Sequence, residues 1–394
     1  MAHLALHGGP KACAVAWPRW PVWNDAERQA LSAVLESGNW WYGEKVAEFE
    51  ASFARFQDAR FGVACTSGTT GLEVALLALG VGAGDEVIVP PYTFVATASA
   101  VLRANAIPIF ADIQPHTLNI DPDDVERKIT TRTRAVIPVH VGGYIADMDR
   151  LTMLARAHGI AIVEDACHAW GSQWRGKGAG ALGQCGVFSF QASKNITSGE
   201  GGIILTDDEE LAATCRSYAN CGRRAGQPWY RHFVPGSNLR LTEFQAAILL
   251  AQLSRLEEQT LRRQANAAIL DAGLRGLPGI TLLADEPRLT RRSYHFYAFR
   301  VDARALGVSR DAFVRALSAE GVPASVGWPT PLYQNPLFLR GSEGMASGTL
   351  SCPVCEQVCT DACWIPQHVL LADQQAMHQI VAAVGKVCTF GREA

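Results

Sequence analysis

Residues 186–206 read Gly-Val-Phe-Ser-Phe-Gln-Ala-Ser-Lys-Asn-Ile-Thr-Ser-Gly-Glu-Gly-Gly-Ile-Ile-Leu-Thr. Two apolar runs, Val187 to Phe190 and Gly202 to Thr206, have the composition of β-strands and enclose a glycine-rich turn that carries Lys194. A turn held between two strands aims its side chains rigidly. A lysine there is either a solvated surface charge, which is the commoner case, or a nucleophile. The rest of the chain has to decide between these two interpretations.

Short apolar runs alternate with helical stretches on the N-terminal side of this turn. The predicted strands are residues 62–66, 86–89, 108–112, 135–140 and 160–164. Such alternation is typical of an α/β fold with a mainly parallel sheet and helices on both faces. Ligands of these sheets bind beyond the carboxyl ends of the strands, so the residues that follow each strand are the candidates for chemistry.

The remaining patterns predict the flanking elements. Helices are expected at 25–37, 45–56 and 209–219, with long helices over 242–274. Beyond Pro278 we expect a smaller α+β unit with strands at 279–283 and 295–301 and helices near 310–320 and 373–386. The predicted organisation is an N-terminal helical segment (1–60), a large domain (61–260) and a small C-terminal domain (261–394).

Composition limits the class of partner. The 394 residues are 48% hydrophobic and 19% charged, which indicates a globular protein and not a disordered one. A net charge of -3 without a basic run argues against nucleic acid or an anionic membrane surface as a partner. The N-terminus lacks the pattern of a signal peptide, and no apolar run is long enough to span a bilayer. We therefore expect a small-molecule ligand and a cytoplasmic location.

The sequence contains 11 cysteines, an odd number that favours reduced thiols over a disulfide framework. Four of them, with His368 nearby, raise the alternative of a zinc site: Cys352, Cys355, Cys359 and Cys363. Structural zinc sites usually pair two short ligand hairpins across a spacer, whereas these four fall in one segment that a single helix could form. Free thiols are therefore favoured, and no metal is predicted.

Three of the strand ends carry patterns with two interpretations each. Residues 67–71, Ser-Gly-Thr-Thr-Gly, fit a phosphate-binding helix start, or an ordinary capping box through Thr70 and Glu73. Tyr92 and Phe94 can stack on a flat ligand or pack in the core. His140 and Tyr144 can lie at the edge of a cleft, although a lone histidine is more often structural. Outside the strands, Trp40 and Trp41 can line a cleft or pack against a neighbouring domain.

The strand 160–164 is followed by Asp165. An acid at the end of a buried apolar strand is costly unless it has a cationic partner or reaches solvent, and no lysine or arginine adjoins it in sequence. A protonated pyridine nitrogen would meet the demand. Asp165 precedes Lys194 by 29 residues, and the phosphate-type loop precedes both. A lysine, an acidic partner for a pyridinium and a phosphate-binding helix start together indicate a pyridoxal phosphate enzyme.

From about residue 20 to 385 the chain resembles the fold-type I pyridoxal phosphate aminotransferases of the DegT/DnrJ/EryC1/StrS group, which act on sugars and cyclitols. The strings that carry the resemblance are Thr66-Ser67-Gly68-Thr69, 90–97, Glu164-Asp165-Ala166-Cys167-His168, Phe188-Ser189-Phe190 with Lys194-Asn195, 199–202, Gly236-Ser237-Asn238 and 241–247. The resemblance implies a large mainly parallel-sheet domain, a smaller C-terminal α+β domain and a homodimer with shared active sites.

The resemblance also implies residue roles. Lys194 would be the Schiff-base lysine and general base, and Asp165 the pyridinium partner. His168 would lie beside the cofactor ring near its phenolic oxygen, and Phe94 would stack on the ring in preference to Tyr92. The phosphate would be held by Gly68, Thr69 and Ser189, and by Asn238 of the neighbouring subunit.

The implied reaction moves an amino group from L-glutamine or L-glutamate to a keto-sugar or keto-cyclitol in secondary-metabolite or sugar biosynthesis. Within the family, the sequence is most similar to aminotransferases of scyllo-inosose-type ketones and to 3-amino-5-hydroxybenzoate synthases, which aromatise an aminoshikimate-like ring. The second group is the main alternative. A dehydratase that replaces the lysine is disfavoured because Lys194 is present. A non-catalytic regulatory protein that binds pyridoxal phosphate is a more distant alternative.

Overall fold

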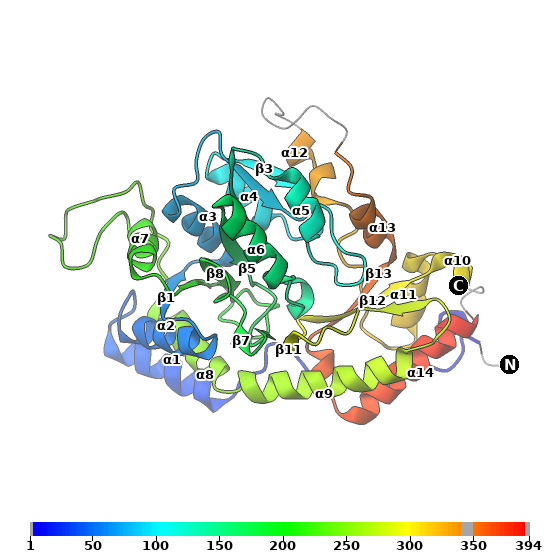
Figure 1. Ribbon diagram of the computed structural model, residues 1–394. Helices are drawn as coiled ribbons and strands as arrows, with labels where there is room; N and C mark the ends of the chain where they lie inside the picture. The colour runs from blue at the N-terminus through cyan, green and yellow to red at the C-terminus, as the bar shows by residue number, and fades with distance from the viewer. Residues whose placement is uncertain (1–2, 340–349, 391–394) are drawn as a thin grey trace.

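The computed structural model describes residues 3–339 and 350–390. In that part of the chain the main sheet has seven strands in the order β1-β9-β8-β5-β4-β2-β3. Strands β1, β8, β5 and β3 of this sheet are labelled in Figure 1. Their bounds are β1 Phe61–Cys65, β2 Glu86–Val89, β3 Ile107–Phe110, β4 Thr133–Val136, β5 Ala161–Asp165, β8 Cys185–Ser189 and β9 Gly202–Thr206. Strand β9 is antiparallel to both of its neighbours, and the other pairs are parallel. The predicted mainly parallel sheet is confirmed.

Helices cover both faces of this sheet. One face packs against α3 (Gly68–Ala78), α4 (Ala96–Arg103) and α7 (Glu209–Ala219). The other packs against α2 (Glu44–Phe56), α5 (Pro122–Lys128), α6 (Met148–His158) and α8 (Glu243–Leu253). Helix α1 (Asp25–Ser37) packs on α8. Successive strand residues alternate between the faces, with Val187 in one apolar core and Phe188 in the other.

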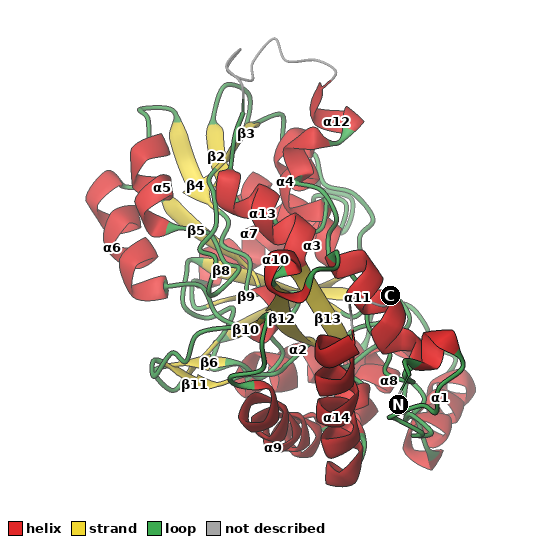
Figure 2. Cartoon of the chain, turned by 90° about the vertical axis from the view of Figure 1, so that its right-hand side faces the viewer, coloured by secondary structure: helices red, strands yellow, loops and turns green. Residues whose placement is uncertain are grey.

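A second unit forms from the C-terminal part of the chain (Figure 2). An antiparallel sheet of β10 (Ile280–Leu282), β12 (Phe296–Val301) and β13 (Ala362–Pro366) packs with α9, α11 and α14. The helix bounds are α9 Leu256–Leu274, α10 Ala303–Leu306, α11 Arg310–Ala319, α12 Pro336–Leu339, α13 Pro353–Asp361 and α14 Gln374–Phe390. Leu4 and Cys13 are buried in the same core, so the beginning of the chain packs against the unit that its end forms. The division between residues 260 and 261 stays a prediction.

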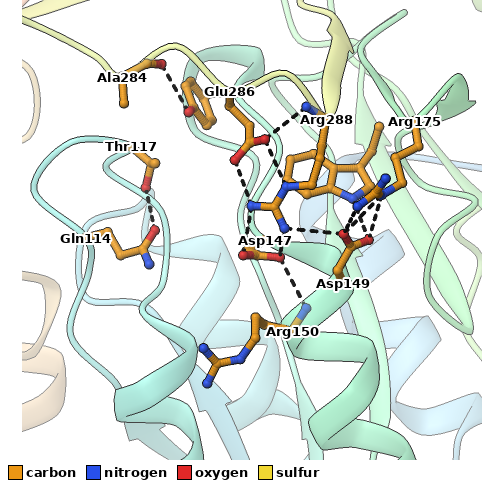
Figure 3. Close-up of polar contacts among 11 residues, drawn as sticks. Gln114, Thr117, Asp147, Asp149, Arg150, Arg175, Ala284, Glu286 and Arg288 are labelled. Atoms are coloured by element: carbon orange, nitrogen blue, oxygen red, sulfur yellow. Dashed lines mark hydrogen bonds and ion pairs between the residues drawn. The ribbon is translucent and has the colours of Figure 1, made fainter.

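Residues 286–291 connect this unit to the main one. Strand β11 (Leu289–Arg291) pairs with β6 (Gln173–Trp174), which in turn pairs with β7 (Lys177–Gly178). Figure 3 shows Arg288 between Glu286 and Asp147, the residue that caps α6; the distances from its guanidinium nitrogens to their carboxylate oxygens are 2.7 and 3.0 Å. An interface held by charged hydrogen bonds at this edge fixes the small unit over the carboxyl ends of the strands.

The predicted end of the fourth strand is wrong. The strand expected at 135–140 ends at Val136, because Pro138 has no N–H to donate to a ladder, and only an isolated bridge at Val139 follows. The long helices expected over 242–274 are confirmed as α8 and α9, which are separated at residues 254 and 255. There the Ser254 hydroxyl donates to the Ala251 carbonyl at 2.8 Å and the chain turns.

The cysteine segment is not a single helix. Cys355 and Cys359 lie one turn apart in α13, with 3.9 Å between their sulfur atoms. Cys352 precedes the helix, and Cys363 lies on β13, because residues 362–366 pair with β12. All 11 cysteines are free thiols in the structure. Within the described residues no cluster of three or more His, Cys, Asp or Glu side chains is arranged to hold a metal. Likewise, no helix in residues 3–339 and 350–390 is long and apolar enough to cross a membrane.

Candidate active site

A cavity of about 500 Å³ lies where β1, β2, β5 and β8 end, beneath residues of the C-terminal unit. Because the strands point their carboxyl ends toward it, this is the place expected for a ligand in an open α/β sheet. Its lining includes every predicted site residue except Asn238: Gly68, Thr69, Phe94, Asp165, His168, Ser189 and Lys194.

Lys194 lies on the turn between β8 and β9, where its backbone N–H donates to the Gln191 carbonyl at 2.9 Å. Its Nζ lies 5.7 Å from the centre of the Trp170 ring. Within the described chain the Nζ atom of Lys194 has no hydrogen-bond or ion-pair partner. Burial lowers the pKa of the Lys194 amine below its ordinary value, an effect that Cys167 and Asp165 partly offset. The structure therefore contains an amine that loses its proton more readily than a surface lysine does.

Asp165 ends β5 and is 5% exposed, so it does not reach solvent. Its Oδ2 accepts a hydrogen bond from the Thr97 hydroxyl at 2.8 Å, and its Oδ1 accepts one from the Cys167 N–H at 3.2 Å. The Thr97 hydroxyl lies 2.8 Å from that of Thr93, one turn earlier. These uncharged donors orient the carboxylate toward the cavity and supply no positive charge. Asp165 therefore still lacks the cationic partner that a buried acid needs.

The start of α3 has free backbone donors at the cavity wall. The capping box is formed by Ser67 and Thr70, not by Thr70 and Glu73 as the spacing suggested, because the Glu73 carboxylate pairs with Arg103 at 2.6 Å. The box uses the Thr70 N–H, and the N–H groups of Gly68 and Thr69 have no acceptor in the described chain. Capping and anion binding are therefore compatible at this helix start.

Gly68 and Ser189 complete this wall. A Cβ at Gly68 would lie 2.8 Å from the Cys167 sulfur and 2.9 Å from the Ser189 Cβ, so only glycine fits. The Ser189 hydroxyl accepts from the Gln191 N–H at 3.3 Å, and its own proton is free for a ligand. The arrangement has the size and donors of a phosphate site.

His168 packs in an aromatic layer above the cavity. Its ring is stacked on His295, with 4.4 Å between centroids, and is nearly parallel to Trp328. Burial, with a smaller effect of Lys194, holds the pKa of both histidines well below the usual range. Nδ1 of His168 accepts from the Gly142 N–H at 3.5 Å, which leaves the single proton of the neutral ring on Nε2.

The aromatic alternatives are resolved by burial. Phe94 lines the cavity and is 60% exposed, whereas Tyr92 is fully buried against Trp328. Trp40 and Trp41 are half-exposed and do not line the cavity.

His140 and Tyr144 are buried, which favours the structural interpretation over a position at the edge of the cleft. His140 is not free because its Nε2 lies 2.8 Å from a carboxylate oxygen of Glu164, at the end of the neighbouring strand.

Asn238 is exposed and lies outside the cavity lining. It forms an isolated bridge with Asn220, at the base of a loop that projects from the body beside α7 (Figure 1). This position does not bring Asn238 to the cavity of its own subunit. Its predicted role toward the neighbouring subunit stays a prediction.

The sequence matches the DegT/DnrJ/EryC1/StrS aminotransferase family over residues 22–385. The chain belongs to this family. It is 39% identical to the L-glutamine:2-deoxy-scyllo-inosose aminotransferase of Micromonospora echinospora, over 100% of this chain and 99% of that protein. The crystal structure of 3-amino-5-hydroxybenzoic acid synthase superposes on this structure with a TM-score of 0.87 at 34% identity. The match covers 95% of this chain and 98% of the synthase chain. A putative sugar aminotransferase from Streptococcus pneumoniae, solved in its PMP form, superposes with a TM-score of 0.85 at 27% identity. The match covers 95% of this chain and 99% of that protein.

This member of the family is a pyridoxal phosphate-dependent aminotransferase of fold type I. The residues at its cavity fit the cofactor. Free N–H groups at the α3 start suit the phosphate, the buried Asp165 suits a pyridinium, and the desolvated Lys194 amine suits the aldehyde carbon.

Sequence reasoning missed several residues of this site. Thr97, which orients Asp165, lies in the first turn of α4, whereas Thr93 precedes that helix, so helical spacing offered no signal for the pair. His295, Trp328 and Trp364 line the cavity from the C-terminal unit. They are distant in sequence from the sheet, and only the packing of the two units brings them there.

Proposed function

We propose that this aminotransferase moves an amino group from L-glutamine, or L-glutamate, to a keto-cyclitol of the 2-deoxy-scyllo-inosose class. The keto-sugars form the wider class of acceptors. The observation that carries the proposal is that Lys194 and Asp165 line one cavity with the free N–H groups of α3. Similarity to a glutamine-dependent inosose aminotransferase along the whole chain supports the choice of substrates.

In this proposal the residues have distinct tasks. Gly68, Thr69 and Ser189 would hold the phosphate, Phe94 would cover one face of the ring, and Asp165 would keep a proton on the ring nitrogen. Pyridoxal phosphate supplies an electron sink for the pair of electrons left when the donor Cα loses its proton. Lys194 would take that proton and return it to the cofactor carbon. Its lowered pKa leaves more of the amine unprotonated for this transfer near neutral pH.

His168 would donate its Nε2 proton to the phenolic oxygen of the ring. The stack with His295 and Trp328 holds the imidazole in one plane, and its lowered pKa keeps it neutral. A neutral donor adds no positive charge beside Lys194, so it does not oppose the proton transfers of that amine.

A half-reaction screen tests the choice of substrate. Enzyme converted to its amine form with L-glutamine is mixed with 2-deoxy-scyllo-inosose, a nucleotide keto-sugar or aminodehydroshikimate, and the return of the cofactor absorbance is followed. The proposal predicts fast return with the cyclitol. Return with the nucleotide sugar alone would contradict it.

The pyridoxal phosphate form of the enzyme, mixed directly with the aminodehydroshikimate-type ring, tests the second candidate function, because that ring already carries its amino group and can condense through it only with the aldehyde form. The structural likeness to 3-amino-5-hydroxybenzoic acid synthase favours a ring substrate that the same lysine would aromatise. Formation of an aromatic product from the aminodehydroshikimate-type ring, with no transfer to the cyclitol, would support that function.

The proposed assembly is a homodimer with shared active sites, in which Asn238 would reach the phosphate of the partner's cofactor. Its support is the loop 221–238, which projects from the body beside α7 (Figure 1). This loop contains Trp229 and Tyr230, two large aromatic residues that are exposed. Large exposed aromatics grouped on one loop are typical of an interface. The proposed location is the cytoplasm, where the free thiols of this chain would stay reduced.

A further inference from the structure

Arg263 is a buried cation without an acidic partner in the described part of the chain. It lies in α9 and is 0% exposed. Burial lowers its pKa to about 9, which still leaves the guanidinium charged at neutral pH. Its Nη1 has no hydrogen-bond partner. A buried charge is costly unless something compensates it, so the surroundings of Arg263 call for an anion.

The neighbour of Arg263 is Gln367, which follows β13. Nε and Nη2 of Arg263 donate to Oε1 of Gln367 at 3.1 and 2.5 Å. Of the two ends of the Gln367 amide only the oxygen can accept a hydrogen bond, so these bonds turn the amide nitrogen away from Arg263. That Nε2 has no partner either, although Gln367 is only 2% exposed. Two bonds from Asn266 to the carbonyls of Leu370 and Ala372 fix this segment on α9.

Gln367 lines a second cavity, of about 490 Å³, that adjoins the first. The two cavities share five lining residues: Gln191, Ser193, His295, Phe296 and Trp364. The second cavity is also lined by Trp20 and His368. The Trp20 ring packs under the Arg263 guanidinium, with 5.8 Å from the guanidinium carbon to the ring centre. None of its described lining residues is an Asp or Glu, and the indole N–H of Trp364 has no acceptor. Behind this wall, Arg263 Nη1, Gln367 Nε2 and the indole nitrogen of Trp364 are therefore buried donors without a partner among the described residues, and the guanidinium places a positive charge beside the substrate space.

We propose that Gln367, polarised and oriented by Arg263, forms the subsite for the α-carboxylate of the amino donor. Gln367 Nε2 donates to the carboxylate, and Arg263 acts through Gln367 as a positioning residue. The inference rests on the proposed function for the identity of the donor, because L-glutamine has a carboxylate at the carbon that carries its amino group. A keto-cyclitol carries no charge and does not need this subsite.

Gln367→Glu gives the sharpest test. The new carboxylate would pair with Arg263, so the variant should unfold at or above the wild-type temperature. It would also repel the donor. We expect the apparent Kd for L-glutamine in the single-turnover half-reaction to rise on the order of 10- to 100-fold. The same variant, loaded with pyridoxamine phosphate, should react with 2-deoxy-scyllo-inosose at the wild-type rate. Gln367→Leu, which removes the amide donor, should also raise the apparent Kd for L-glutamine.

Gln259→Leu is the matched control. Gln259 also accepts from Arg263, at 3.4 Å, but it does not line the cavity, so its loss should leave the Kd for L-glutamine unchanged. Equal losses in both half-reactions of Gln367→Glu, or no loss in the first, would overturn the subsite. If Gln367→Glu slowed only the reaction with a ring that carries a carboxylate, such as aminodehydroshikimate, the subsite would belong to the acceptor. That result would overturn its assignment to the amino donor.

A binding measurement separates this inference from the proposed function. Glutaramate keeps the carboxylate of glutamine and lacks its α-amino group, and glutaramide is the uncharged analogue. Calorimetry on wild-type holoenzyme should show tighter binding of glutaramate, and Gln367→Glu should abolish the preference. Absence of a preference in the wild type would refute the subsite whichever ketone the enzyme accepts. Failure with every cyclitol would refute only the proposed acceptor.

Discussion

At the scale of single residues, the site depends on a carboxylate that is buried but not neutralised. Asp165 is held by Thr97 and by one backbone N–H, and both are uncharged donors. Such donors fix the direction of a carboxylate and leave its charge for a ligand. The ligand, and not the protein, is therefore expected to supply the cation that Asp165 needs.

Replacement of Thr97 tests this division of tasks. Thr97→Val removes the hydroxyl that donates to Asp165 at 2.8 Å and keeps the shape of the side chain. A lost hydrogen bond to a charged group costs about 1.5–3 kcal/mol, so we expect kcat to fall by about 10- to 100-fold. Thr97→Ser, which keeps the hydroxyl, should retain most of the activity. Equal activity of the valine and serine variants in steady-state assays would show that the contact does not orient Asp165.

The lowered pKa of Lys194 predicts the pH dependence of cofactor loading. Only the neutral amine attacks an aldehyde, so the rate at which apoenzyme takes up pyridoxal phosphate should rise with pH as Lys194 loses its proton. Because burial lowers the pKa of Lys194 below 10.5, the midpoint of this rise should lie below 10.5. Stopped-flow absorbance over a pH series measures it. A midpoint at or above 10.5 would be inconsistent with a desolvated amine.

At the scale of elements, the beginning of α3 combines a capping box with free N–H groups, and close packing forces glycine at its first residue. Gly68→Ala would place a methyl group 2.8 Å from the Cys167 sulfur. Relief of that overlap would displace the helix start, so we expect cofactor affinity to fall at least 10-fold, which corresponds to about 1.4 kcal/mol.

Gly82→Ala is the control for this prediction, because a Cβ at Gly82 meets nothing within 4 Å. Fluorescence titration of each apoenzyme with pyridoxal phosphate gives the affinities. Wild-type affinity in Gly68→Ala would show that the α3 start does not hold the phosphate.

Much of this element-level arrangement was predictable from sequence. The sheet strands and the turn that carries Lys194 follow local patterns of apolar and glycine residues, and the structure confirms the parallel sheet. The capping box was assigned to the wrong pair because Ser67-Thr70 and Thr70-Glu73 have the same spacing, and only the Glu73–Arg103 contact distinguishes them. The donor subsite could not be found, because Arg263 and Gln367 are separated by 104 positions in sequence.

At the scale of the whole molecule, the cavity is built by two units and, in our proposal, by two subunits. Mixed dimers test the second statement. Lys194→Ala and Asn238→Asp should each be inactive or impaired alone, the second because a carboxylate would repel the phosphate. If Asn238 acts across the interface, a mixture refolded together contains dimers with one intact site, and activity should return toward a quarter of the wild-type value.

The control for the mixed dimers is the double variant, which keeps both changes in one chain. In a mixed dimer of this double variant with wild type, shared sites would each carry one of the two defects and neither would be intact. If Asn238 acted within its own subunit, one of the two sites would be intact, so the activity of this mixture distinguishes the two arrangements. Sedimentation of the mixture establishes the oligomeric state. Failure of the single variants to complement one another, in a mixture that does sediment as a dimer, would place Asn238 outside the partner's site.

The central claim is that Lys194 moves the proton between the donor Cα and the cofactor. The most direct measurement is a single turnover of Lys194→Ala holoenzyme with L-glutamine, followed by cofactor absorbance with and without added methylamine. We predict that the variant binds pyridoxal phosphate, converts L-glutamine at least about 10²-fold more slowly than the wild type, and regains part of the rate with the exogenous amine. Conversion by Lys194→Ala at the wild-type rate, without any added amine, would contradict the claim.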